Sequence, residues 1–322
     1  MHTDLTLSDF RSAHALLQGH ILLTPLVASS SLYTPAGQPI LLKAENLQRS
    51  GSFKIRGASY SLSQLTDAQR QRGVIAYSTG NHAQAVALAA QQQHIPATIV
   101  MSPDVPHHKV ERTRNSGAII LWADPSSQAR RHMAETLAAE HGLALIPPYD
   151  HPDILLGQGT IGLEIVQQCI PAAIFVPIGG GGLIAGIALA IKLTNPSIRI
   201  IGVEPVWEND AWQSFNQGSL ITLPTTSSSI ADAIRVQSLG ELPYTVIRRY
   251  VDEIVTVSES QIAAATLAAF TETHLVLEPS GAVALAAAQS YQSTLPEASP
   301  VVAIASGGNT TLEALSSLTT LK

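Results

Sequence analysis

The segment Ser50–Ala58 carries the side chain with the clearest potential for covalent chemistry. In it, Lys54 lies between the apolar residues Phe53 and Ile55, where a helix is expected to begin. A lysine in an apolar site near a helix N-terminus has a lowered pKa, and its neutral amine can form a Schiff base with a carbonyl compound. Spacing alone leaves two interpretations of Lys54 open, a nucleophile and a solvated surface lysine.

A glycine-rich turn between Pro177 and Gly186 is the second candidate, and it contains Gly179, Gly180, Gly181 and Gly182. Four residues without a Cβ, at the start of an expected helix, form a cradle of N–H groups for an anion, most naturally a phosphate. The turn lacks the Gly-Lys-Ser/Thr ending of a Walker A loop. Its spacing satisfies the loose dinucleotide fingerprint, with Glu204 ending the next strand. A nicotinamide-dependent oxidoreductase is therefore the alternative from a different class.

Two further turns offer polar groups. Ser78, Thr79, Asn81 and His82 follow an apolar run and precede a helical one, and Ser306 follows the last apolar run. Ligands of open α/β sheets bind outside the carboxyl ends of the strands. We therefore expect the turns to form one site.

The elements that must position these turns alternate between short β-branched runs and longer segments of helical period, which predicts βαβ units with parallel sheets. Strands are expected at 40–43, 74–77, 97–101, 118–121, 174–177, 198–203 and 301–305, and helices at 52–65, 81–92, 127–141, 153–168, 182–193, 260–273 and 281–291. The segment 72–146 reads as a complete α/β unit with three strands. We predict a small domain at 72–146, inserted into a large domain formed by 1–71 and 147–322.

Composition limits the possible partners. Charged residues make up 13% of the chain and apolar residues 45%, and the net charge is −6. This negative balance, without any run of Lys or Arg, argues against nucleic acid. Cys169 is the single cysteine, so no disulfide can form within the chain. The N-terminal stretch has no apolar signal-peptide region. The uncharged residues 171–190 contain prolines and glycines that are unsuited to a membrane span. We expect a cytoplasmic protein without a membrane partner.

The segment Glu45–Ala58 resembles the pyridoxal-phosphate attachment signature of the serine/threonine dehydratases, the family of biodegradative threonine dehydratase and serine racemase. Further motifs follow in that family's order: Ser-x-Gly-Asn-His-Ala at 78–83, Gly-Gln-Gly-Thr at 157–160, the tetraglycine, Glu-Pro-Ser-Gly-Ala at 278–282 and Ser-Gly-Gly-Asn at 306–309. The resemblance implies a fold-type II pyridoxal-phosphate enzyme, similar to the tryptophan synthase β chain, with two open parallel-sheet α/β domains, and it favours a homodimer.

The resemblance also implies a role for each motif residue. Lys54 would hold the cofactor as a Schiff base, with Phe53 against its ring. The phosphate would lie on Gly179, Gly180, Gly181 and Gly182, the ring hydroxyl on Asn81, and the pyridine nitrogen on Ser306. Ser78, Thr79, Asn81 and His82 would hold the substrate carboxylate.

The implied reaction is elimination of water from a serine- or threonine-like β-hydroxy amino acid, giving a 2-oxo acid and ammonia, with Lys54 taking the α-proton. Serine racemase is the first alternative. Thr79 stands where racemases use serine as the opposite-face base, and its extra methyl puts racemisation in doubt. A larger substrate is the second alternative, such as hydroxyaspartate, phenylserine or a hydroxyectoine-pathway intermediate, because Ala233 and Arg235 depart from the usual Ala-Asp-Gly pattern.

A metal site is the last candidate. Glu204 and Asp210 are two carboxylates around a turn, with Glu208 between them, and hard oxygen ligands of this kind suit Mg²⁺ or Ca²⁺. On spacing alone, two solvated acids are the commoner explanation. The resemblance implies a divalent cation held by Glu204, the carbonyl of Glu208 and Asp210.

Overall fold

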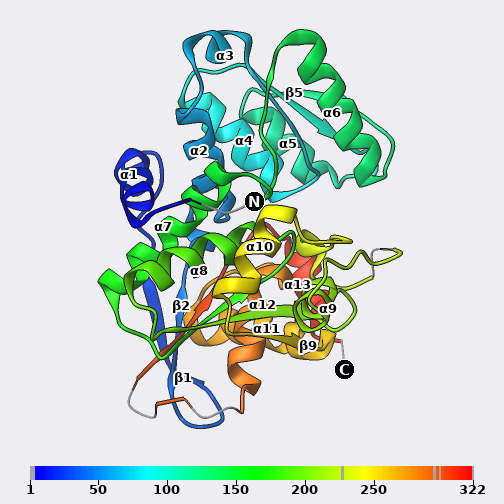
Figure 1. The fold of residues 1–322 in the computed structure, drawn as a ribbon. Helices are drawn as coiled ribbons and strands as arrows, with labels where there is room; N and C mark the ends of the chain where they lie inside the picture. Colours follow the sequence, from blue (N-terminus) through cyan, green and yellow to red (C-terminus); the bar gives the residue numbers. More distant parts are fainter. Residues whose placement is uncertain (1–3, 226–227, 293–294, 297–298, 321–322) are drawn as a thin grey trace.

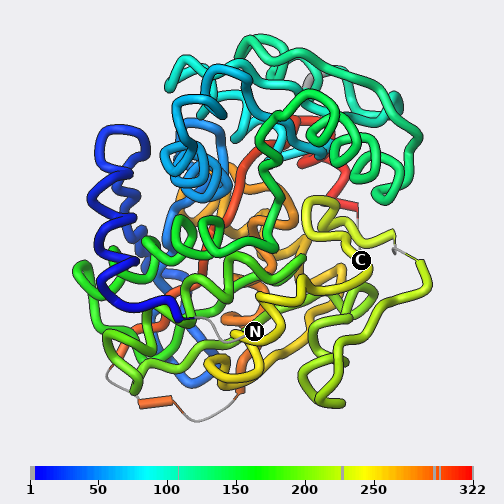
Figure 2. The backbone as a smooth tube through the Cα atoms, turned by 45° about the horizontal axis from the view of Figure 1, so that its top comes forward, coloured from blue at the N-terminus to red at the C-terminus, as the bar shows by residue number. Residues whose placement is uncertain are grey.

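Two β-sheets organise the chain into two lobes (Figures 1 and 2). The computed structural model describes residues 4–225, 228–292, 295–296 and 299–320. The sheet of the large lobe has the order β1-β2-β10-β7-β8-β9, and its strands are β1 (Leu26–Tyr33), β2 (Pro39–Lys43), β10 (Val301–Ile304), β7 (Ala173–Pro177), β8 (Arg199–Pro205) and β9 (Glu253–Val257). The sheet of the small lobe has the order β5-β4-β3-β6, with strands β5 (Ile119–Trp122), β4 (Ala97–Met101), β3 (Val74–Tyr77) and β6 (Ala144–Leu145).

The helices lie on both faces of these sheets and between them. They are α1 (Leu7–Leu17), α2 (Lys54–Ser63), α3 (Asp67–Arg72), α4 (Asn81–Gln92), α5 (His107–Asn115), α6 (Ser127–His141), α7 (Pro152–Gln168), α8 (Gly182–Thr194), α9 (Asp210–Gln217), α10 (Glu241–Tyr250), α11 (Glu259–Thr273), α12 (Pro279–Ser290) and α13 (Leu312–Leu318), with short 3-10 turns η1 (Glu45–Leu47) and η2 (Asp232–Ile234). No helix in the described part of the chain is long and apolar enough to cross a membrane.

The strands pair in parallel, except that β1 is antiparallel to β2 at one edge of the large sheet. Strand β10 lies between β2 and β7, with Val301 opposite both Ile40 and Ala173. Because parallel strands end at the same edge, the turns after β2, β7 and β10 lie side by side. The fold is thus the α/β architecture with open parallel sheets that was expected from the sequence.

Alternation along the strands divides the core of the large lobe into two layers. Phe175 packs with the apolar residues of α11 and α12 on one face. Its neighbours Ile174 and Val176 pack with α7 and α8 on the other face. Both faces of the sheet are covered around its centre, so the central strands β10 and β7 are apolar throughout, as is usual for parallel sheets.

Glycines let the helices that carry the site approach each other closely. A Cβ on Gly157 would lie 2.6 Å from the Cα of Gly57 in α2, and a Cβ on Gly186 in α8 would lie 2.4 Å from the carbonyl oxygen of Leu155 in α7. Side chains at these positions would force the helices apart. The Gly-Gln-Gly-Thr motif therefore holds α2 and α8 against α7, and with them Lys54 and the tetraglycine turn.

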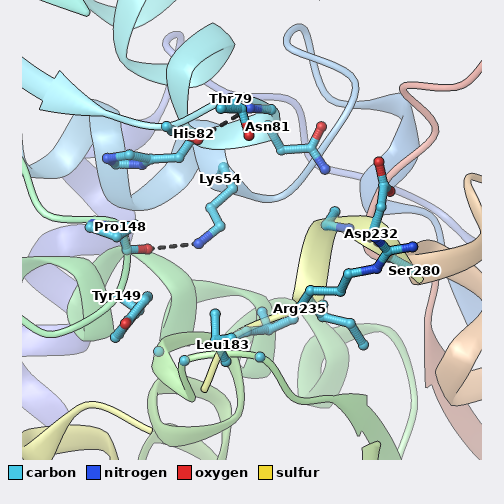
Figure 3. A pocket seen from close by; sticks show the side chains of 18 of the residues that line it. Lys54, Thr79, Asn81, His82, Pro148, Tyr149, Leu183, Asp232, Arg235 and Ser280 are labelled. Carbon is cyan, nitrogen blue, oxygen red and sulfur yellow. Dashed lines mark hydrogen bonds between the residues drawn. The ribbon is translucent and has the colours of Figure 1, made fainter. Parts of the chain in front are cut away.

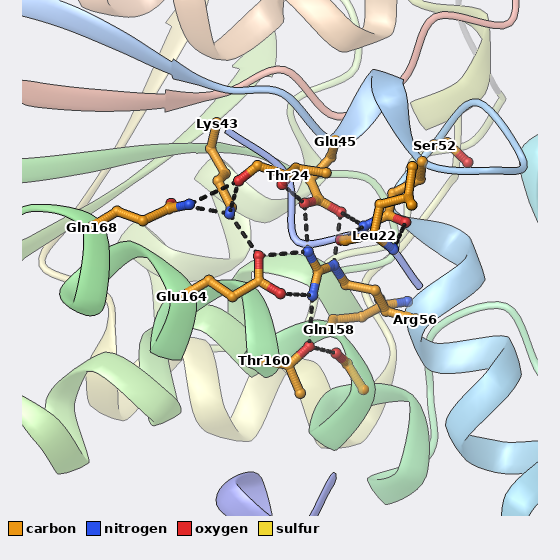
Figure 4. A network of polar contacts seen from close by, with 12 residues as sticks. Leu22, Thr24, Lys43, Glu45, Ser52, Arg56, Gln158, Thr160, Glu164 and Gln168 are labelled. Carbon is orange, nitrogen blue, oxygen red and sulfur yellow. Dashed lines mark hydrogen bonds and ion pairs between the residues drawn. The ribbon is translucent and has the colours of Figure 1, made fainter. Parts of the chain in front are cut away.

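A buried ion network fixes the first turn of α2 (Figure 4). The guanidinium of Arg56 donates to both oxygens of Glu45 at 2.8 and 2.7 Å and to both oxygens of Glu164 at 2.6 and 2.9 Å. Lys43 in β2 donates to Glu164 at 2.6 Å and to the carbonyl of Thr24 at 2.8 Å. The positive charges of Lys43 and Arg56 are thus balanced by the carboxylates of Glu45 and Glu164 in a site that excludes solvent. Arg56 follows Lys54 by two residues, so the network holds the start of α2 in place.

Every strand and helix expected from the sequence is present, with ends that differ by at most two residues. The sequence patterns missed β1, β6, β9 and several short amphipathic helices, because these elements are short or lie at edges where polar residues interrupt the apolar pattern. The small sheet has four strands instead of three, all between residues 74 and 145. Helix α2 packs against both α4 and α7, so the domain limits at 72 and 146 stay a prediction.

Candidate active site

A cavity of about 210 Å³ lies between the two lobes (Figure 3). Every residue predicted to bind the cofactor or the substrate lines it: Phe53, Lys54, Ser78, Thr79, Asn81, His82, Gly179, Gly180, Gly181, Gly182 and Ser306. The structure therefore assembles in one place the turns that the sequence separates by up to about 250 residues.

Lys54 is the first residue of α2, and its amine projects into the cavity (Figure 3). Its Nζ donates to the carbonyl oxygen of Pro148 at 2.7 Å and lies 5.2 Å from the centre of the Phe53 ring. Burial lowers the pKa of Lys54 to about 8, because an ammonium ion loses hydration there. A neutral amine, the form that attacks a carbonyl group, is thus accessible near neutral pH.

Two helix N-termini without side-chain caps face this cavity. Helix α4 begins after Gly80 and α8 after Gly181, and within the described part of the chain no side chain caps the first N–H groups of either helix. Such N–H groups bind anions, assisted by the helix dipole. The cavity thus offers two anion sites, which suits a phosphate group on α8 and a substrate carboxylate on α4.

The tetraglycine is required by what packs on it. A Cβ on Gly180 would lie 2.3 Å from the ring of Tyr149, and Gly181 has a φ of +90°, which L side chains rarely adopt. Tyr149 lines the cavity beside Pro148 and was not singled out by sequence reasoning. In the sequence, Tyr149 is marked only as an aromatic residue that follows two prolines and a very short strand.

The wall opposite α8 is polar. Asn81 donates from Nδ2 to Glu278 Oε1 at 2.5 Å, and the buried hydroxyl of Ser306 donates to the carbonyl of Ser280 at 3.4 Å. Burial raises the pKa of Glu278 to about 7, although the bond from Asn81 acts in the opposite direction. Glu278 belongs to the Glu-Pro-Ser-Gly-Ala motif, but no pattern in the sequence assigns it a role.

The predicted carboxylate-binding turn has an unexpected feature at His82. Its ring is buried, and its Nε2 lies 2.9 Å from the carbonyl oxygen of Ile146, to which the neutral ring can donate. Burial, together with the charge of Lys54, lowers the pKa of His82 to about 3, so the ring is neutral at physiological pH. The N-terminus of α4 and the hydroxyls of Ser78 and Thr79 are therefore the groups left for a carboxylate.

Several cationic side chains line the cavity. Lys109 pairs with Asp232 at 2.9 Å. Arg130 donates to the carbonyl of Pro125, and Arg235 donates from Nε to the carbonyl of Ser229 at 2.7 Å. Among the described residues neither guanidinium forms an ion pair with a carboxylate. Both side chains line the cavity and bring positive charge to it, and the charge of Asp104 partly offsets that of Arg130.

The three residues of the predicted metal site lie outside the cavity lining, around the turn from β8 to α9, and all are buried. Glu204 accepts from the N–H groups of Ala211 and Trp212 at 3.1 and 2.7 Å. Neither carboxylate oxygen of Asp210 has a hydrogen bond of normal geometry. Burial raises the pKa of Glu204 well above its usual range and that of Asp210 to about 7. The described residues contain no group of three or more His, Cys, Asp or Glu side chains placed to hold a metal.

The donor set of the cavity fits pyridoxal phosphate. The cofactor has an aldehyde, a phosphate and a hydroxylated pyridine ring. The cavity has a buried amine at Lys54 and neutral donors at Asn81 and Ser306. It also has an uncapped helix N-terminus at α8, preceded by glycines where any Cβ would contact neighbouring residues. Each group of the cofactor thus has a matching partner in this chain.

Comparison with known proteins agrees with this assignment. A model of the family described as "Pyridoxal-phosphate dependent enzyme" matches residues 17–307. The chain is 41% identical to L-threo-3-hydroxyaspartate ammonia-lyase from a Pseudomonas species over 96% of this chain and 97% of the relative. It is 41% identical to the catabolic L-threonine dehydratase of Escherichia coli over 98% of this chain and 96% of the relative.

The structure of maize serine racemase is similar throughout, with a TM-score of 0.93 and 40% identity, and covers 98% of this chain and 97% of that one. These matches decide against the nicotinamide alternative suggested by the glycine spacing. They agree with the buried amine of Lys54 and the glycine turn at residues 179–182. These matches show that the chain belongs to the pyridoxal-phosphate dependent enzyme family.

Proposed function

We propose that the chain is a dehydratase that removes water from a β-hydroxy amino acid and yields a 2-oxo acid and ammonia. The observation that carries this proposal is the amine of Lys54, which has a pKa of about 8 and lies in the same cavity as two uncapped helix N-termini. The relatives named above as ammonia-lyase and threonine dehydratase support the same reaction class.

The residues of this chain would share the work as follows. Lys54 would hold pyridoxal phosphate, with Phe53 against the ring and the phosphate on Gly179, Gly180, Gly181 and Gly182. Asn81 would donate to the ring hydroxyl and Ser306 would meet the ring nitrogen. When bound, the cofactor withdraws electrons from the α-carbon of an amino acid.

The N-terminus of α4, with Ser78 and Thr79, would orient the substrate by its carboxylate. The Nζ of Lys54 would take the α-proton, which its lowered pKa permits. The β-hydroxyl, once protonated, leaves as water, and the released enamine hydrolyses to the 2-oxo acid and ammonia. Ser306 is a neutral hydroxyl, and such a partner would leave the ring nitrogen of the cofactor largely unprotonated, which favours elimination.

The unpaired guanidinium groups of Arg130 and Arg235 favour a substrate with an acidic β-substituent, such as 3-hydroxyaspartate. A second carboxylate in the cavity would find two cations that form no ion pair with a carboxylate among the described residues. The relative named for L-threo-3-hydroxyaspartate supports this choice over threonine or serine. Phenylserine and the hydroxyectoine-pathway compound bring no such complementary charge.

A panel of β-hydroxy amino acids tests the proposal, with 2-oxo acid release as the readout. We expect turnover of serine, threonine and 3-hydroxyaspartate, with the highest kcat/KM for 3-hydroxyaspartate. Arg130→Gln and Arg235→Gln should lower that value for 3-hydroxyaspartate while changing threonine turnover little. Absence of 2-oxo acid from every member of the panel would contradict a dehydratase, and rapid interconversion of serine enantiomers would favour a racemase.

Two further features belong to the proposal. Mg²⁺ or Ca²⁺ would bind Glu204, the carbonyl of Glu208 and Asp210, since a cation would compensate the buried acids whose pKa values are raised. The protein would act as a cytoplasmic homodimer, which the low charge content and the single cysteine support. Light scattering after size-exclusion chromatography tests the dimer.

A further inference from the structure

A chain of hydrogen-bonded side chains links the small lobe to the large one and ends at two residues that line the cavity, Asn81 and Glu278. Arg112 in α5 donates to Oδ1 of Asn309 at 2.7 Å, and Nδ2 of Asn309 donates to the carbonyl of Ser50 at 2.8 Å. The same Nδ2 donates to Oδ1 of Asn81 at 2.8 Å, and Nδ2 of Asn81 donates to Glu278 at 2.5 Å. Four side chains are thus joined in series.

The chemistry of its end groups gives this chain a fixed direction. A guanidinium only donates and a backbone carbonyl only accepts, so Arg112 and Ser50 determine which way the amide of Asn309 faces. Asn309 must then present a donor to Asn81. The amide oxygen of Asn81 must in turn face Asn309, and its amide nitrogen must face Glu278. Glu278 therefore has to be the acceptor.

The second N–H of the Asn81 amide has no partner among the described residues, and Asn81 lines the cavity. This N–H is the group that would donate to the cofactor's ring oxygen. If the amide turned over, an oxygen would face that ring oxygen instead and the contact would be repulsive. The orientation of one amide therefore decides whether Asn81 binds the cofactor or opposes it.

Glu278 is built into the wall so that it reaches Asn81. It is the N-cap residue of α12, yet its carboxylate does not cap that helix. A Cβ on Gly307 would lie 2.2 Å from Oε1 of Glu278, so only glycine leaves room for the carboxylate there. The side chain is 3% exposed. Its position is thus fixed by packing and by the bond from Asn81.

We propose that Glu278, as an ionised acceptor, is a positioning residue that holds the donor side of the Asn81 amide toward the ring oxygen of the cofactor. This inference rests on the proposed role of Asn81 in cofactor binding. Protonation of Glu278 removes the charged acceptor, and the amide then loses its strongest partner. Cofactor binding should therefore weaken as Glu278 takes up a proton.

The charged groups around Glu278 determine the pH at which it takes up a proton. Burial and the carboxylate of Asp232 in η2 raise its pKa, while the Asn81 bond and the cations Lys109 and Arg112 in α5 lower it, with a net value of about 7. Glu278 is thus ionised above about pH 7 and protonated below it. The contribution of Glu278 to cofactor affinity should be present at pH 8 and lost at pH 6.

Titration of the apoprotein with pyridoxal phosphate tests the inference, using wild type and Glu278→Gln across this pH range. At pH 8 the dissociation constant of the variant should exceed that of wild type about tenfold, as expected for loss of one charged hydrogen bond. At pH 6 the ratio should approach one, since wild-type Glu278 is then neutral as well. The titration of Lys54 affects both proteins equally and cancels in the ratio. The visible spectrum of the bound cofactor should show a step near pH 7 in wild type that Glu278→Gln lacks.

Asp232→Asn is the matched control, because it removes another carboxylate of the same cavity wall that lies outside the amide chain. It should keep the pH-dependent step and move its midpoint to lower pH. Arg112→Ala, at an exposed side chain, should weaken cofactor binding in the same direction and remains decisive if Glu278→Gln does not fold.

A Glu278→Gln ratio that is the same at pH 6 and pH 8, or equal to that of Asp232→Asn, would overturn the inference. Wild-type affinity and spectrum in Arg112→Ala would also overturn it. A wild-type protein that binds no pyridoxal phosphate contradicts the proposed function instead. The two failures are therefore distinguishable.

Discussion

Replacing Glu164 by glutamine should destabilise the protein by about 3–5 kcal/mol, the usual cost of removing one partner from a buried ion network. The carboxylate of Glu164 accepts from Arg56 at 2.6 and 2.9 Å and from Lys43 at 2.6 Å, and all three side chains are at most 1% exposed. Glutamine has nearly the same volume, so the cost arises from charge. Among the residues that the structure describes, Glu45 would be the one acid left to balance Lys43 and Arg56 (Figure 4).

The pH dependence of this stabilisation follows from the pKa of Glu164. Burial alone would raise this pKa, but the charges of Arg56 and Lys43 lower it below its usual value. A carboxylate whose pKa is lower in the folded state contributes stability above its unfolded pKa, near 4.3, and loses it as the pH falls through the folded value. The difference between wild type and Glu164→Gln should therefore be full at pH 7 and should shrink in strong acid.

Thermal unfolding followed by circular dichroism measures this effect, and we expect a fall in Tm on the order of 10 °C. Glu135→Gln is the matched control, because Glu135 forms an ion pair with Arg131 at 2.7 Å with the two side chains 42% and 64% exposed. An exposed pair contributes only about 0–1 kcal/mol. Adding Lys43→Met to Glu164→Gln restores the charge balance and should recover part of the loss. Equal melting temperatures for Glu164→Gln and Glu135→Gln would refute this reasoning.

Three further outcomes are expected. Lys54→Ala should lose the visible absorbance of the covalently attached cofactor, and a variant that keeps this band would show that another group holds the cofactor. Thr79→Ser should shift the products of serine from 2-oxo acid toward the opposite enantiomer, because removing the methyl frees the hydroxyl to rotate; a wild type that racemises serine as fast as it eliminates water contradicts this argument. Mg²⁺ or Ca²⁺ should raise the Tm of wild type by mass action, more at pH 8 than at pH 6 because Asp210 has a pKa of about 7 and must release its proton to bind the ion. Glu204→Gln and Asp210→Asn should abolish this increase, and equal shifts in all three proteins count against the site.

The alternation of apolar runs and helical periods was sufficient to predict the parallel α/β elements and most of their ends. The runs at β7 and β8 are long, apolar and bounded by turns, so their type follows from local composition. The edge strand β9 was missed because Glu253 and Thr256, which are only partly buried, break the apolar pattern. The two-residue strand β6 carries no pattern of its own and exists only because β3 supplies a partner.

For the site, the sequence by itself determined the chemical groups, because each motif is a contiguous turn whose residue types already specify an amine, a phosphate cradle or a carboxylate site. Only the tertiary structure decided how these groups influence each other. The lowered pKa of Lys54 comes from burial between the lobes, the amide direction of Asn81 from Asn309 and Glu278, and the need for glycine at 180 from Tyr149. These contacts join residues far apart in the chain, and burial and hydrogen-bond direction arise from such contacts, so no local pattern contains them.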